Sequence, residues 1–169
     1  MIAYKFLRAD GTSPFATFRW DLPDTKPGGW VEARVDPCRS GIHACRPGDL
    51  PFWAGDSLYE IEVDGEIVEG RSKLVASRGR LLRPVDAWDD ELRGAYARAC
   101  AERAHELAFG ATPPLEDWYA MAEASIDQGA GPIGFVTARI AEEALGPDGH
   151  RTERARQAAW LVEQLGLGG

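Results

Sequence analysis

The spacing of apolar residues along the chain changes character near residue 88. Before this point, short runs rich in aromatic and β-branched residues are interrupted by Gly, Pro and Asp, as is typical of strands and turns. After it, the chain is rich in Ala, Leu, Glu and Arg, and apolar residues recur every three or four positions, as in amphipathic helices. The pattern predicts an α+β fold, with a β-rich module over residues 1–86 and an Ala-rich helical subdomain over residues 87–169.

The β-rich module is predicted to form a mostly antiparallel sheet of about five or six strands. Its clearest element is a hairpin in which residues 57–63 and 66–69 flank an Asp64-Gly65 turn. The last stretch is either a pair of strands or one strand with a bulge around Gly79. Further strands are expected at residues 2–8, 15–20, 30–35 and 73–85.

The second part is predicted to contain four helices. The first begins with Asp86 as its N-cap and ends at Gly110. Its apolar stripe consists of Trp88, Leu92, Tyr96, Cys100, Ala104 and Leu107. The other three helices are expected within residues 113–126, 133–145 and 152–165.

Composition and charge exclude several classes of partner. The chain has 169 residues, is 44% hydrophobic and carries a formal net charge of −8. This acidity resides in residues 89–169, which hold 7 Lys and Arg against 14 Asp and Glu. An acidic chain is a poor match for nucleic acid or anionic membranes, and no apolar run approaches the roughly 20 residues of a membrane span. We therefore expect a cytoplasmic protein whose partner is another protein or a small molecule.

The most distinctive local pattern is a cluster of two thiols and an imidazole at Cys38, His43 and Cys45. These residue types are zinc ligands, but a tetrahedral structural site needs a fourth, which Cys100, His105 or a carboxylate would have to supply. Zinc is therefore one possible cofactor. The other two interpretations are a reactive thiol activated by neighbouring cationic side chains, and plain packing of both cysteines in the core.

Three tryptophans, Trp20, Trp30 and Trp53, fall within the β-rich module. They are predicted to lie in the core or in the wall of a pocket, because large aromatic rings commonly line concave binding sites. The sequence contains no Gly-rich phosphate loop and no nucleophile elbow or zinc-protease motif. Whether the protein is an enzyme therefore stays open at this level.

The stretch from Cys38 to Cys45, the hairpin around Asp64-Gly65 and the strand after Lys73 resemble an uncharacterised family of phage and bacterial proteins. Members of that family carry a C-x-x-G-(F/I)-H-x-C stretch, a short aromatic segment, a V-E-x-x-G-E strand turn and a Lys-containing strand. The final residues, about 146–167, look like those of actinobacterial hypothetical proteins. This resemblance implies a module boundary and no defined activity.

A second likeness is to ADP-ribosyltransferase-type folds, which bind NAD. The segments Gly41-Ile42-His43-Ala44, 50–53 and 58–65 occur in the order of a G-I-Y-x-(T/A) strand, an aromatic helix and an L-x-E-V-x-x-G strand. The resemblance implies that Arg8 or Tyr4 contacts NAD. It also implies that Glu60 or Glu62 stabilises an oxocarbenium-like transition state.

The leading functional hypothesis is a binding or accessory module that recognises a protein or a small ligand. The alternatives are an NAD-using transferase and a zinc- or thiol-dependent function at the Cys/His cluster. The candidate pocket consists of Arg8, Cys38, His43, Cys45, Trp53, Glu60 and Glu62.

Overall fold

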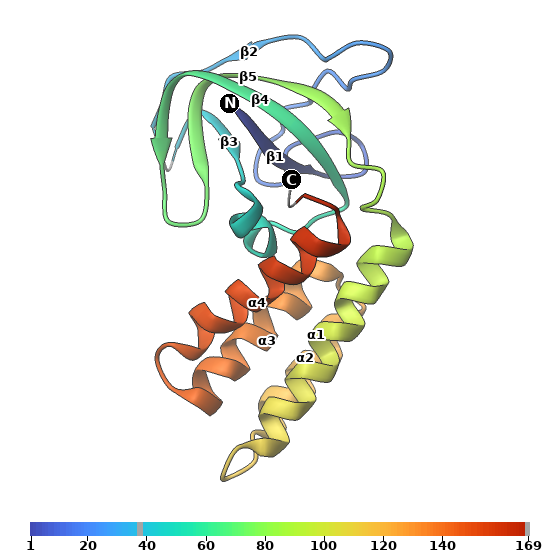
Figure 1. The fold of residues 1–169 in the computed structure, drawn as a ribbon, viewed down its shortest axis with the longest axis vertical. Helices are drawn as coiled ribbons and strands as arrows, with labels where there is room; N and C mark the ends of the chain where they lie inside the picture. The colour runs from blue at the N-terminus through green and yellow to red at the C-terminus, as the bar shows by residue number, and fades with distance from the viewer. Residues whose placement is uncertain (37–38, 168–169) are drawn as a thin grey trace. The chain divides into compact units, whose positions relative to one another are not determined.

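The structure is a computed structural model that describes residues 1–36 and 39–167. It has the expected α+β fold, with an antiparallel five-stranded sheet followed by four helices (Figure 1). The chain divides into two compact units, Met1–Trp88 and Asp89–Gly169.

The β-rich unit is built on two long strands, β4 and β5, which Figure 1 shows as strongly bent. The sheet order is β1-β4-β5-β2, and β3 also pairs with β5. A short 3-10 helix, η1, connects β3 to β4. The bounds are β1 Ile2–Leu7, β2 Val31–Glu32, β3 Ile42–Ala44, η1 Pro47–Phe52, β4 Ser57–Glu69 and β5 Leu74–Pro84.

The sheet curls until its two ends meet. Directly after β3, the Cys45 amide donates to the carbonyl of Tyr4 at 2.7 Å, and the Tyr4 amide donates to the carbonyl of Cys45 at 2.9 Å. Strands β1, β4, β5 and β3 therefore form a closed ring of hydrogen-bonded neighbours. Alternate side chains of β1 point inward, so that Ala3 and Leu7 belong to the buried core of this unit.

The predicted hairpin turn at Asp64-Gly65 is wrong. Strand β4 runs through these residues to Glu69, with a shift in pairing register between Asp64 and Ile67. Gly65 has a φ of +76°, and a Cβ at this position would lie 2.2 Å from the Ser77 hydroxyl. An Asp-Gly pair suits a bulge as well as a turn, because both need a residue with positive φ.

The actual reversal between β4 and β5 lies at Gly70, whose amide donates to the carbonyl of Lys73 at 2.8 Å. Of the two alternatives for residues 73–85, the single strand is the one observed, as β5 Leu74–Pro84. The prediction of a strand at residues 15–20 is also wrong. These residues belong to the loop after β1, where Thr12 and Arg19 form an isolated bridge. The strand expected at residues 30–35 is shortened to β2.

All four predicted helices are present, with bounds α1 Asp90–Gly110, α2 Glu116–Ile126, α3 Ala130–Leu145 and α4 Gly149–Gln164. The N-cap of α1 is Asp89 and not Asp86, because the Asp89 carboxylate accepts a hydrogen bond from the Leu92 amide at 2.8 Å. The expected stripe of α1 is buried from Tyr96 through Cys100 to Leu107. Among the helices that the structure describes, none is both long enough and apolar enough to cross a membrane.

The helices also bury a polar cluster that the sequence pattern does not reveal. Gln157 of α4 donates to the carbonyl of Gly134 at 3.0 Å. It also accepts from the Tyr96 hydroxyl at 3.2 Å and from Arg154 at 3.0 Å. These contacts join α1, α3 and α4 of the helical unit, because a buried amide must find partners for both its oxygen and its nitrogen.

Gly79 sets the spacing between three strands and provides a test of the ring. A Cβ at Gly79 would lie 2.7 Å from Ile42 Cγ2 and 3.3 Å from the carbonyl of Glu62. We expect Gly79→Ala to lower the free energy of unfolding by about 1–3 kcal/mol, as overpacking usually does. Gly48, which would have no atom within 4 Å of an added Cβ, provides the control.

Urea unfolding followed by tryptophan fluorescence measures both variants. Gly48→Ala is expected to stay within about 0.5 kcal/mol of the wild type. Equal effects of the two substitutions would contradict the packing role assigned to Gly79.

Candidate functional site

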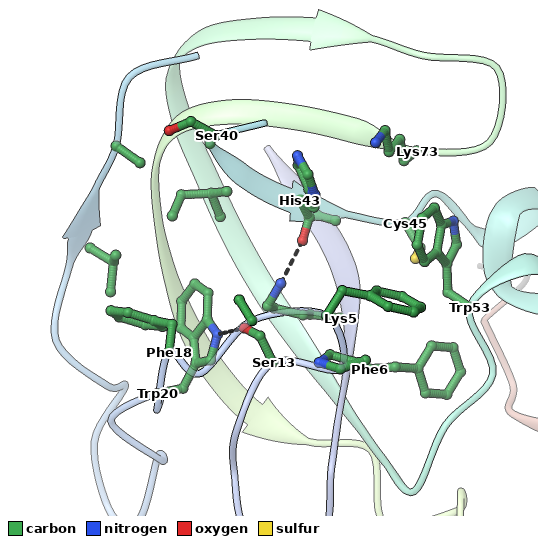
Figure 2. A pocket seen from close by; sticks show the side chains of 18 of the residues that line it. Lys5, Phe6, Ser13, Phe18, Trp20, Ser40, His43, Cys45, Trp53 and Lys73 are labelled. Carbon is green, nitrogen blue, oxygen red and sulfur yellow. Dashed lines mark hydrogen bonds between the residues drawn. The ribbon is translucent and has the colours of Figure 1, made fainter. Parts of the chain in front are cut away.

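A cavity of about 420 Å³ opens in the β-rich unit, between β1, β3 and the loop that follows β1 (Figure 2). Its volume falls within the range of sites that hold small molecules. Of the residues singled out from the sequence, His43, Cys45 and Trp53 line it. Trp20, expected in a core or a pocket wall, also lines it.

The unusual residue of this cavity is Lys5. It lies on β1 between the inward-facing Ala3 and Leu7, and its side chain is only 7% exposed. Its ammonium group donates to the carbonyl of His43 at 2.7 Å and lies 4.9 Å from the centre of the Trp20 ring. In Figure 2 the side chain points toward that carbonyl, with Trp20 and Trp53 to either side in this view.

No carboxylate neutralises this buried charge within residues 1–36 and 39–167. Burial lowers the pKa of Lys5 to about 8, because the charged form loses the hydration that it would have in water. The thiol of Cys45 acts weakly in the opposite direction. Lys5 is thus an ammonium group whose charge is only partly compensated by one carbonyl and one aromatic face.

His43 contributes a second polar group without a full set of partners. Its Nε2 atom is buried and has no hydrogen-bond partner among the residues that the structure describes. Burial lowers the pKa of His43, and the charges of Lys73 and Lys5 lower it further. The imidazole is therefore neutral at pH 7 and leaves a ring nitrogen free for a hydrogen bond.

Cys45 has the properties of a core cysteine. It is 4% exposed, and burial raises the pKa of its thiol to about 12. A thiol that stays protonated at neutral pH is a weak nucleophile and a weak metal ligand. Within the described part of the chain, no group of three or more His, Cys, Asp or Glu side chains is placed to hold a metal ion. Cys38, the third member of the predicted zinc set, lies outside the described residues.

Two pairs of aromatic rings contribute to the cavity wall. Trp53 donates from its indole nitrogen to the carbonyl of Ser72 at 2.5 Å, and Phe15 meets it edge to face at 5.8 Å. Phe18 makes a similar contact with Trp20 at 5.4 Å. Both phenylalanines come from the loop after β1, and Phe15 is 84% exposed. The third tryptophan, Trp30, lies elsewhere, under the guanidinium groups of Arg78 and Arg80.

The charges around the cavity are mostly positive, although the whole chain is acidic. Lys73 and Arg39 line it together with Lys5, whereas Glu32 is the one carboxylate among the described lining residues. The Lys73 ammonium lies 5.7 Å from the centre of the Trp53 ring. The cavity therefore favours a negatively charged occupant.

The other candidate residues lie away from this cavity. Arg8 is exposed and donates to the carbonyl of Pro14 at 2.6 Å. Glu60 binds Arg83 through two hydrogen bonds of 2.5 and 2.9 Å. Glu62 accepts from Arg80 at 2.8 Å. These two carboxylates form ion pairs between β4 and β5 and do not line the cavity.

Comparison with protein-family models, with curated proteins and with solved structures gives no match for this chain.

Lys5 is not among the site residues predicted from the sequence, although two signals in the sequence point to it. One is a charged residue at an inward position of an otherwise apolar strand, between Ala3 and Leu7. The other is the scarcity of lysine, since Lys5, Lys26 and Lys73 are the only three among 19 basic residues. Two of these three line the same cavity.

Lys5 should make stability depend on pH. Its pKa is about 8 in the folded protein and 10.5 in an unperturbed lysine, so the folded state releases its proton first. Below pH 8, Lys5 is charged in both states, and its burial lowers the free energy of unfolding by the full cost of desolvating the charge. Between pH 8 and 10.5 the folded state has lost the proton while the unfolded state still holds it, so the free energy of unfolding rises with pH. Relative to Lys5→Met, the wild type should therefore gain about 1 kcal/mol of unfolding free energy for each pH unit in this range.

Urea unfolding of both proteins at pH 7, 8, 9 and 10 measures this difference. Other ionising groups contribute to both proteins and largely cancel. Lys26→Met is the control, because it shows how the loss of an exposed lysine changes the free energy of unfolding at each pH. A difference between Lys5→Met and the wild type that does not change with pH would show that Lys5 is not buried as a charge.

The burial of Cys45 and Cys100 predicts that neither thiol is reactive in the folded protein. Burial also raises the pKa of Cys100 to about 12. In a Cys38→Ser background, we expect a maleimide to label both thiols in urea but neither in native buffer at pH 7, as measured by peptide mass mapping. Rapid native labelling of Cys45, with Cys100 still protected, would instead assign Cys45 to a reactive site.

Proposed function

We propose that the β-rich unit is a binding domain for a small organic anion with a planar, apolar body. The observation that supports this most directly is the buried ammonium of Lys5 in the wall of an aromatic-lined cavity, which pairs with no carboxylate of the described residues. Small-ligand recognition is one of the two forms of the binding-module hypothesis. A concave cavity of about 420 Å³ favours it over recognition of a protein surface.

The charge of the ligand follows from electrostatics. Removing an ammonium group from water is costly unless an opposite charge or several hydrogen bonds replace the lost hydration. Lys5 has three N–H donors and uses one of them on the carbonyl of His43. A carboxylate or phosphate oxygen would satisfy another donor and neutralise the charge. Lys73 and Arg39 would add attraction for the same anion.

The expected shape of the ligand follows from the aromatic residues that line the cavity. Trp20 and Trp53 line the cavity, and each is supported by a phenylalanine from the loop after β1. Rigid aromatic walls favour a flat ring system, which stacks on them or meets them edge to face.

Isothermal titration calorimetry with 2-naphthoate and 2-naphthamide at pH 7 tests this proposal. The two probes have nearly the same shape and differ in charge. We expect 2-naphthoate to bind at least about tenfold more tightly, because hydrogen bonds to charged groups contribute about 1.5–3 kcal/mol. Lys5→Met should weaken the binding of 2-naphthoate and narrow its advantage over the amide, while Lys73 and Arg39 still attract the anion.

The control is Lys26→Met, which removes an exposed lysine and should leave the affinity for 2-naphthoate unchanged. Thermal unfolding of each variant shows that it is folded. Equal affinity for the acid and the amide, or full affinity in Lys5→Met, would refute the proposal.

NAD is included as a third probe, because the resemblance to ADP-ribosyltransferase-type folds implies it. It belongs to the same chemical class, with planar rings joined by an anionic pyrophosphate. Lys5-dependent binding of NAD, without any binding of 2-naphthoate, would favour the nucleotide as the ligand.

A further inference from the structure

If the only role of position 5 were to bind an anion, arginine would serve it better than lysine. The chain relies on arginine elsewhere and contains lysine at only three positions. Arginine binds carboxylate and phosphate through two parallel hydrogen bonds and stays charged when buried. What a buried lysine offers in addition is an amine that can lose its proton and act as a nucleophile.

The surroundings of Lys5 favour that role. Its Nζ is held by the carbonyl of His43 and by the face of Trp20, which fix the direction of the side chain. No acidic side chain in the described residues locks it in the charged state. Because burial lowers its pKa to about 8, about a tenth of the amine is neutral at pH 7.

We propose that Lys5 forms an imine with a ligand that carries an aromatic aldehyde together with an anionic group. This inference rests on the proposed function, because the anion is what brings the ligand into the cavity. Lys73 and Arg39 line the same cavity and remain to hold that anion when Lys5 reacts with the carbonyl.

The reaction balances without an oxidant or a reductant. The lone pair of the neutral Lys5 amine forms a bond to the carbonyl carbon, and a proton passes from nitrogen to oxygen to give a carbinolamine. Loss of the hydroxyl group and the remaining N–H proton as water leaves a carbon–nitrogen double bond. Water added across that bond releases the aldehyde again, so the attachment is reversible.

Reductive trapping with 4-formylbenzoate tests the inference. Sodium cyanoborohydride supplies a hydride to the imine carbon and converts it to a stable secondary amine. The chain has four primary amines, at Met1, Lys5, Lys26 and Lys73, so peptide mass mapping assigns each product. We expect Lys5 to be trapped at least about tenfold faster than the exposed Lys26, because desolvation activates lysine amines.

Excess 2-naphthoate should protect Lys5 from trapping, because both compounds would occupy the same cavity. Lys5→Arg should abolish trapping at position 5, since it keeps the charge and removes the nucleophile. The mapping of the wild-type protein is decisive even if this variant does not fold.

The outcomes separate this inference from the proposed function. Lys5-dependent binding of 2-naphthoate, with trapping at Met1, Lys26 or Lys73 ahead of Lys5, would overturn the imine and leave the anion site intact. No binding of 2-naphthoate and no trapping at Lys5 would overturn both. Preferential trapping at Lys5 that 2-naphthoate suppresses would support both.

Discussion

The β-rich unit depends on the pair of backbone hydrogen bonds between Tyr4 and Cys45. They join β1 to the residue after β3 and close the sheet into a ring. The closure places the carbonyl of His43 where the side chain of Lys5 can reach it. Without it, Lys5 would lie on an edge strand, where its charge could be hydrated. The ring is thus what turns an ordinary basic residue into a buried one.

Much of the architecture could be predicted from local patterns. The four helices follow from apolar spacing, which directly reports the face that each helix buries. The errors arise where two structures share one local signal. Asp64-Gly65 satisfies a turn and a bulge equally well, and only the long pairing of β4 with β5 decides between them. Asp86 and Asp89 are both good N-caps, and the choice depends on where the helical backbone begins.

The site was less accessible from sequence. His43, Cys45 and Trp53 were singled out for their residue types and do line the cavity, but their neighbours in space are far from them in the chain. Lys5 is 38 residues from the carbonyl that it contacts. Glu60 and Glu62 alternate along a strand as catalytic carboxylates could, yet their arginine partners come from the next strand. Long-range pairing, which no local window contains, decides all of these cases.

The buried charge of Lys5 has a consequence for the lifetime of the protein in a cell. A buried ammonium group without an opposite charge lowers the free energy of unfolding of the β-rich unit. The unit therefore unfolds more often, and the unfolded chain is open to proteases. If the cavity binds an anion as proposed, and only in the folded state, the ratio of unfolded to folded protein falls by a factor of 1 + [L]/Kd, where [L] is the free anion concentration. Occupancy would then govern abundance, and the amount of protein present would follow the supply of its ligand.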